Sequence, residues 1–158
     1  ESQSASNKKK KSRSNKKDHS RYRQPFDIVY CPNALCVADV HSHLCSQVEI
    51  MGLLGGKYDA AKRVLYVLKC YPIREEEQDE HTVSADAGDQ FAVSERMRNE
   101  DKLELVGWYH SHPCFENVPS NTDCHQHFMQ KHEDELAHPY VGLIIASWST
   151  MLVDCGQS

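Results

Sequence analysis

Hydrophobic residues are distributed along this chain of 158 residues in short runs that have the spacing of β-strands. Five runs are rich in β-branched and aromatic residues and are bounded by proline, glycine or polar residues, a pattern typical of strands. The second run is expected to end in a glycine turn at Gly55-Gly56, and the last, which is entirely apolar, is expected to be a buried strand. The expected strands are residues 26–30, 48–56, 64–71, 103–112 and 141–146.

Three further segments have the spacing of helices. These are residues 34–45, with Asn33 as the expected cap, residues 90–102, and residues 121–130, which Ser120 can cap. Residues 75–89 are acidic and polar, and we expect them to form a loop that could face a partner. Because strands and helices are interspersed without an internal repeat, the pattern predicts a mixed α/β (α+β) domain, a sheet flanked by helices.

Charge divides the chain into two parts. Residues 1–23 carry nine Lys and Arg against two acidic residues, a net charge of +7, which leaves −12 for the remainder of a chain with net charge −5. Residues 1–24 contain too little apolar surface to fold and are predicted to be a disordered basic tail. This tail could be a nuclear import signal, a patch that contacts acidic surfaces, or a solvated linker. The acidic domain over residues 25–158 is not expected to bind nucleic acid directly.

Cysteine usage indicates the compartment. The chain has seven cysteines, an odd number, with no CxxC pair, no secretory signal and no long apolar span. These features favour free thiols in a soluble intracellular protein, nuclear or cytoplasmic, and the basic tail favours the nucleus.

Candidate metal ligands cluster near residue 110. Side chains two residues apart on a strand project to the same side, so His110 and His112 point together, and Pro113 ends the strand beside them. Asp123 follows in the first turn of the helix that Ser120 caps, where it could supply an oxygen ligand. Three protein ligands leave the fourth position of a zinc ion open, which is typical of catalytic rather than structural zinc sites.

Two more residues could take part in hydrolysis. Glu49 is a carboxylate within an apolar run, a costly position unless the group is solvated, paired or used as a base. Ser120 is placed to donate a hydrogen bond near the metal. Taken singly, each feature has a simpler interpretation: an exposed or structurally bonded His-x-His pair, an edge-strand glutamate, and a helix cap.

Residues 110–123 nevertheless match the pattern HxHPx6Sx2D of the JAMM/MPN+ zinc metalloproteases. The segment 49–56, EIMGLLGG, resembles the strand of that family that carries its catalytic glutamate, and residues 107–109, GWY, also resemble the family. The loop 114–120 and the segment 39–43 are most similar to the branch of the histone deubiquitinase with Myb-like, SWIRM and MPN domains and its MPN-domain-containing relatives. Motif and flanking segments cover most of residues 25–148.

The resemblance implies a function and a site. It implies one Zn²⁺ per chain held by His110, His112 and Asp123, with Glu49 as general base and Ser120 as the residue that steadies the oxyanion. It implies the MPN fold, which is cytidine-deaminase-like, over residues 25–158, shortened at its C-terminal end relative to the family. The implied reaction is hydrolysis of a ubiquitin–lysine isopeptide bond, with a ubiquitinated histone or nucleosome as a candidate target and partner subunits as a further possibility.

Alternatives remain open from the sequence. The chain could be a non-catalytic MPN scaffold that binds ubiquitin or complex partners, or a JAMM hydrolase for a ubiquitin-like modifier. Asp39, His41 and His43 superficially repeat the HxH motif, but residues two apart on a helix do not share a face, so we expect a structural or surface role for them. The later histidines and Cys124 are expected at the surface or in packing, and Cys114 could line a substrate groove.

Overall fold

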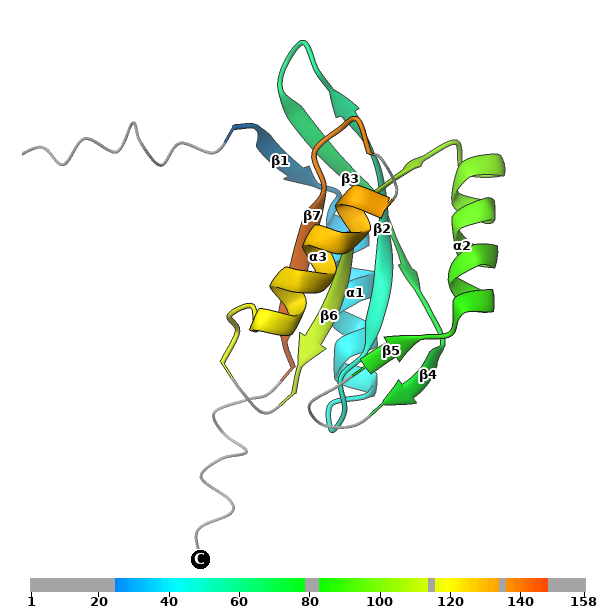
Figure 1. Ribbon diagram of the computed structural model, residues 1–158, viewed down its shortest axis with the longest axis vertical. Coiled ribbons are helices and arrows are strands. Elements are labelled where there is room, and N and C mark those ends of the chain that lie inside the picture. The colour runs from blue at the N-terminus through cyan, green and yellow to red at the C-terminus, as the bar shows by residue number, and fades with distance from the viewer. Residues whose placement is uncertain (1–24, 79–82, 114–115, 134–135, 148–158) are drawn as a thin grey trace, which may run out of the picture.

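The computed structural model describes residues 25–78, 83–113, 116–133 and 136–147 (Figure 1). The predicted basic tail and Cys114 lie outside these residues. The described elements follow one another in the order β1 (Asp27–Tyr30), α1 (Pro32–Leu44), β2 (Met51–Asp59), β3 (Val64–Pro72), β4 (Glu75–Gln78), β5 (Val83–Ala85), α2 (Ala87–Asn99), β6 (Glu104–His112), α3 (Asn121–Glu133) and β7 (Val141–Ala146). The mixed α/β class predicted from the hydrophobic pattern is thereby confirmed.

Five of the strands form one curled, mixed sheet in the order β1-β3-β2-β6-β7. The central strand β2 runs antiparallel to both β3 and β6, whereas the two outer pairs, β1 with β3 and β6 with β7, are parallel. Strand β6 therefore lies between β2 and β7, and its backbone is held from both sides. This is the strand that carries the two histidines.

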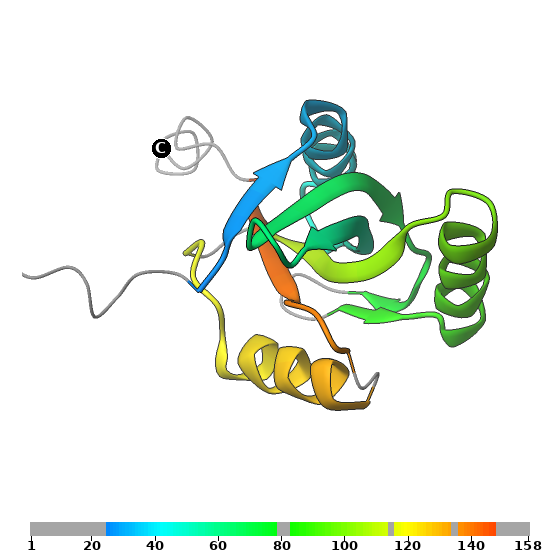
Figure 2. The ribbon, with the colours of Figure 1, turned by 90° about the horizontal axis from the view of Figure 1, so that it is seen from above.

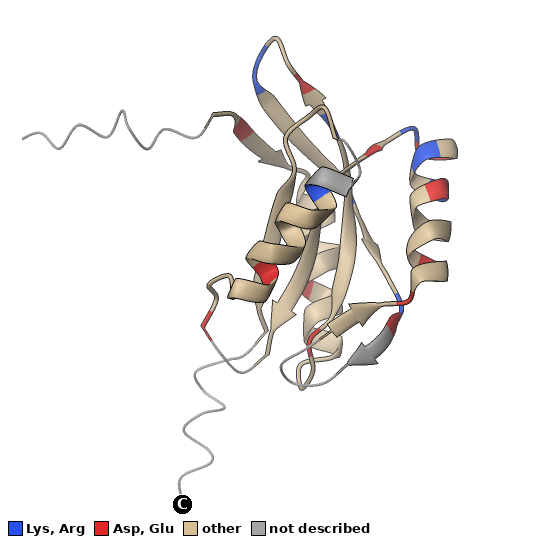
Figure 3. Ribbon diagram, viewed as in Figure 1, with Lys and Arg blue, Asp and Glu red and all other residues tan. Residues whose placement is uncertain are grey.

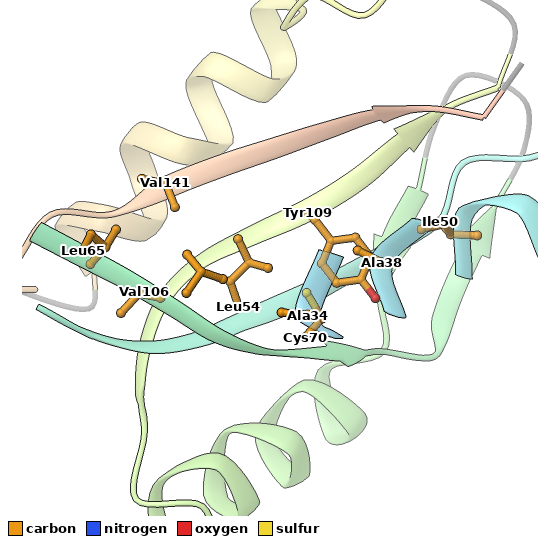
Figure 4. Packing of buried hydrophobic residues seen from close by; sticks show 10 residues of the cluster. Ala34, Ala38, Ile50, Leu54, Leu65, Cys70, Val106, Tyr109 and Val141 are labelled. Atoms are coloured by element: carbon orange, nitrogen blue, oxygen red, sulfur yellow. The ribbon is translucent and has the colours of Figure 1, made fainter. Parts of the chain in front are cut away.

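The two faces of the sheet are covered by different helices, as the view from above shows (Figure 2). On one face, α1 contributes Ala34 and Ala38 to the larger core of ten buried residues, nine of which are labelled in Figure 4. On the opposite face, Leu53, Tyr71 and Ile73 pack with Met97 of α2. Because neighbouring residues of β6 alternate between the faces, Tyr109 belongs to the α1 core while Trp108 faces α3.

The ends of two helices differ from the sequence-based prediction. Helix α1 begins at Pro32, with Cys31 at the N-cap and no side-chain cap, so Asn33 is not its cap. The fixed backbone angle of proline suits the first helical position and starts the helix earlier than expected. Helix α2 begins at Ala87 rather than residue 90, because the Asp86 side chain accepts a hydrogen bond from the Asp89 amide at 2.7 Å.

The acidic stretch 75–89 was expected to be a loop, and this was wrong. It contains the antiparallel hairpin β4–β5 and the first residues of α2. The hairpin strands have only four and three residues, and β4 consists of Glu and Gln, which are not typical strand formers. Local sequence therefore carries almost no strand signal here.

Strand β2 also differs from its prediction at both ends. It begins at Met51, so Glu49 precedes the strand instead of lying inside it. At the other end, Gly55 and Gly56 continue the strand through a β-bulge, and the glycine turn expected there is absent. A side chain at Gly56 would collide with the carbonyl oxygen of Tyr66, so the glycine serves close strand packing rather than a turn.

Strand β7 occupies the predicted residues but is less buried than expected. Val141 is buried, whereas residues 143–146 are only partly covered, because β7 is an edge strand of the sheet. None of the described helices is long and apolar enough to cross a membrane.

Candidate metal centre

The two histidines lie at the end of β6, as the strand spacing predicted. The two residues are 5% and 1% exposed, and the Nε2 atoms of His110 and His112 are 2.9 Å apart. Backbone pairing on both sides of β6 fixes this geometry: Met51 of β2 lies opposite His110, and Ile144 and Ala146 of β7 lie beside the two histidines. Two ring nitrogens are thus directed at one point.

Hydrogen bonding indicates the tautomer of His112, and burial favours the neutral form of His110. Nδ1 of His112 lies 2.8 Å from the Glu116 carbonyl oxygen, which can only accept, so this Nδ1 carries the hydrogen. In its neutral form His112 therefore has its lone pair on Nε2. Burial lowers the pKa of His110 from 6.5 to about 4, although the nearby Asp123 carboxylate acts in the opposite direction. Neutral imidazole is the form that binds metal ions.

Asp123 joins the histidines from α3. Its Oδ1 lies 3.6 Å from Nε2 of His110, and its Oδ2 lies 3.7 Å from Nε2 of His112. The Ser120 amide donates to Oδ2 of Asp123 at 2.7 Å, and the Asp123 amide donates to the Ser120 hydroxyl oxygen at 3.1 Å. This reciprocal pairing resembles a capping box and holds the carboxylate at the start of α3. Ser120 thus caps the helix as predicted.

Glu49 lies at the same place, beside the two histidines. It is 7% exposed, and one carboxylate oxygen, with one ring nitrogen from each of His110 and His112, belongs to a set of atoms that all lie within 4.8 Å of one another. A cavity of about 280 Å³ is lined by all five residues expected at the site, together with Met51, Val83, Trp108, Thr122, Gln126 and Gln130. The structure therefore brings the five predicted residues together.

Trp108 supports the site and was not singled out from the sequence. Its ring is stacked on that of His110, with centroids 5.0 Å apart and planes at 6°. Its indole N–H donates to Nδ1 of His127 on α3 at 3.2 Å. The sequence signals were its place in the segment GWY, which resembles the family, and its position two residues before His110, which places it on the same face of β6.

The donor atoms fit a tetrahedral zinc ion. Two ligand atoms about 2.0–2.1 Å from zinc, at a tetrahedral angle, are about 3.3 Å apart. The Nε2 atoms of His110 and His112 are 2.9 Å apart, and each lies 3.6–3.7 Å from a different oxygen of the Asp123 carboxylate, so these separations lie on either side of this value. Two imidazole nitrogens with a carboxylate oxygen are also a donor set that zinc accepts. The group of Glu49 and the two histidines could hold a metal ion.

The second His-x-His segment does not resemble a metal site. Nδ1 of His41 lies 3.0 Å from the Tyr109 hydroxyl, whereas His43 is exposed and its Nδ1 lies 2.8 Å from the Asp39 carbonyl oxygen within α1. The two rings thus have different partners, as expected for residues two apart on a helix. His125 and Cys124 are exposed, and His127 packs against Trp108, as predicted for surface or packing residues.

Known proteins similar to this chain include MPN domain-containing proteins and a deubiquitinase. An MPN domain-containing protein of Drosophila melanogaster is 38% identical over 130 residues, which is 79% of this chain and 9% of that protein. The histone deubiquitinase MYSM1 of Branchiostoma floridae is 31% identical over 127 residues, 80% of this chain and 15% of that protein. The chain thus spans only a small part of the length of these relatives.

A solved structure and a family match agree with the fold. The solution structure of a protein from Desulfitobacterium hafniense superposes with a TM-score of 0.55 at 26% identity and covers 64% of this chain and 67% of that one. Residues 28–135 match the family described as JAB1/Mov34/MPN/PAD-1 ubiquitin protease. This match includes all five residues of the site, and the chain belongs to this MPN family.

Proposed function

We propose that this protein is a zinc-dependent isopeptidase that hydrolyses the bond between the C-terminus of ubiquitin and a lysine side chain. The observation that carries the proposal is that the Nε2 atoms of His110 and His112 are 2.9 Å apart and that each lies 3.6–3.7 Å from an oxygen of Asp123, with Glu49 beside the histidines. His110, His112 and Asp123 would hold the zinc ion. The description of the family to which the chain belongs includes the term ubiquitin protease, which supports ubiquitin conjugates as the substrate class.

The residues around the ion have complementary tasks. Zinc, when bound, lowers the pKa of a water molecule towards neutrality and polarises a carbonyl group. Glu49 accepts the proton of the attacking water and later returns it to the departing lysine amine. The Ser120 hydroxyl accepts the Asp123 amide hydrogen, which leaves its own hydrogen available to donate to the oxyanion that forms at the attacked carbonyl.

The cavity admits an extended chain end rather than a folded surface. It measures about 280 Å³, and the hairpin contributes Val83 to one side while α3 contributes Thr122, Gln126 and Gln130 to the other. The flexible C-terminal tail of ubiquitin, ending in the attacked carbonyl, suits such a site. Lys and Arg are absent from β6 and β7, the strands beside the site (Figure 3).

The physiological target is proposed to be a ubiquitinated histone. The relative from Branchiostoma floridae is named as a histone deubiquitinase, and the basic residues 1–24 suit the acidic surface of a nucleosome or a nuclear import receptor. Nuclear action follows from this target. Cleavage of the isopeptide bond would not require the acidic domain, residues 25–158, to bind DNA.

Turnover of di-ubiquitin and of ubiquitinated nucleosomes, with and without a chelator, tests the proposal. Glu49→Gln should retain one zinc per chain and lose most turnover, whereas His110→Ala should lose zinc as well as turnover. Glu104→Gln, an exposed carboxylate on β6, and His43→Ala, an exposed histidine, serve as matched controls and should behave like the parent.

Other results would favour other functions. A parent protein that binds no zinc and still binds ubiquitin would be an MPN scaffold. Zinc-dependent cleavage of a ubiquitin-like modifier, without cleavage of ubiquitin, would change the substrate and keep the chemistry. Full turnover by Glu49→Gln would contradict the role of Glu49.

A further inference from the structure

Glu49 lies just outside the regular ladder of the sheet, so the ladder alone does not set its position. Strand β2 begins at Met51, and the first pair of the β2–β6 ladder is Met51 with His110. One residue earlier, the Ser111 amide donates to the Ile50 carbonyl oxygen at 3.0 Å, and the Ile50 amide donates to the Ser111 hydroxyl oxygen at 3.1 Å. We refer to these two hydrogen bonds as the Ile50–Ser111 link.

The link holds the peptide unit that carries Glu49. The Ile50 N–H belongs to the planar peptide group that joins Glu49 to Ile50, so a bond to this N–H restrains the Cα of Glu49. In a regular antiparallel pair a backbone carbonyl would accept this hydrogen. Here a side-chain hydroxyl accepts it, which makes the geometry depend on the identity of residue 111.

Ser111 cannot act on zinc or substrate itself. Alternation along β6 directs its side chain to the face opposite His110 and His112, where it is 0% exposed. Its surroundings on that face are the α1 core, which contains Ile50 and Tyr109. A hydroxyl buried among apolar groups is unfavourable unless it forms hydrogen bonds. The hydrogen bond that the Ser111 hydroxyl accepts from the Ile50 amide explains why a polar residue occupies this buried position.

We propose that Ser111 is a positioning residue that fixes Glu49 beside the histidine pair, and that its hydroxyl is required for turnover without contributing to zinc binding. The proposal rests on the proposed function for its catalytic consequence. The zinc donors His110, His112 and Asp123 do not depend on the Ser111 hydroxyl for their contacts with one another. Loss of the hydroxyl should therefore displace the base and leave the metal.

The matched variants are Ser111→Thr and Ser111→Val, which have similar volume and differ in the hydroxyl. In the zinc-free protein, amide exchange measured by NMR should be about tenfold faster at Ile50 in Ser111→Val than in Ser111→Thr, because a buried hydrogen bond is lost. In the zinc-loaded protein, kcat of Ser111→Val should fall roughly 10- to 100-fold, the size expected from a displaced catalytic group. KM and zinc affinity should not change.

A double variant tests whether Ser111 acts through Glu49. In the Glu49→Gln background, Ser111→Val should cause no further loss of kcat, whereas an undiminished further loss would overturn the proposal. Equal Ile50 exchange in the Thr and Val variants would also overturn it. If the added methyl group prevents folding, Ser111→Ala compared with the parent gives the same readouts. A parent protein without isopeptidase activity would refute the proposed function, while the exchange measurement would still decide whether the link holds the Glu49 segment.

Discussion

Acid should destabilise the zinc-free protein because its fold buries a neutral histidine. Burial lowers the pKa of His110 from 6.5 to about 4, so between these pH values the unfolded chain takes up a proton that the folded protein does not. Stability is unaffected by this group above pH 6.5 and falls as the pH decreases through the window. This difference between the pKa of His110 in the unfolded chain and in the folded protein corresponds to a loss of up to about 3 kcal/mol in the free energy of unfolding.

The loss is large enough to measure by thermal unfolding. For a domain of this length, a change of about 1 kcal/mol in the free energy of unfolding changes Tm by roughly 2–4 °C. The titration of His110 should therefore lower Tm by roughly 6–12 °C when the pH decreases from 6.5 to 4. His110→Gln removes the titrating group and should show a correspondingly smaller decrease. Burial also lowers the pKa of His41 and of His127, but both residues are present in parent and variant, so their contribution cancels in the comparison.

Saturating zinc adds a second arm to this experiment. Because zinc and a proton compete for the same imidazole nitrogen, excess zinc should move the loss of stability in the parent to lower pH. The His110→Gln variant lacks this nitrogen, so zinc should change its pH dependence much less. Parallel decreases of Tm in the zinc-free parent and in zinc-free His110→Gln would refute the reasoning.

Two further predictions concern residues beside the site. Tyr109→Phe removes a hydroxyl that is 3.0 Å from Nδ1 of His41, and should lower the free energy of unfolding in urea by about 1 kcal/mol; no change would contradict the hydrogen bond. Ser120→Ala removes both the cap of α3 and the proposed oxyanion donor, and should cost about 1 kcal/mol of stability and roughly 10²–10³ in kcat. Glycine at the N-cap retains most of the capping stability. Ser120→Gly should therefore lose as much kcat as Ser120→Ala with little loss of stability, which would separate the two roles. Full kcat in Ser120→Gly would refute the catalytic role.

Much of the site could be predicted because its residues follow local rules. The period of two along a strand places His110 and His112 on one face, and a serine before a polar helix start predicts the cap that holds Asp123. Both rules concern residues close together in the sequence. The structure agrees with them at β6 and at the start of α3.

The features that were missed depend on contacts between distant parts of the chain. Glu49 was expected inside a strand, but the strand begins at Met51, and the Ser111 hydroxyl, 61 residues from Ile50, bonds the preceding peptide unit. The bulge at Gly56 is likewise set by packing against Tyr66 of the neighbouring strand. Period and propensity within one segment contain no information on such partners.

The central claim is that one zinc ion is held by two imidazoles and one carboxylate. X-ray absorption spectroscopy of the zinc-loaded protein tests it directly, because zinc–nitrogen and zinc–oxygen distances are about 2.0–2.1 Å and zinc–sulfur distances are about 2.3 Å. The account predicts one zinc per chain with only nitrogen and oxygen neighbours, two of them from His110 and His112. A sulfur neighbour, or a spectrum unchanged in His110→Ala, would contradict it.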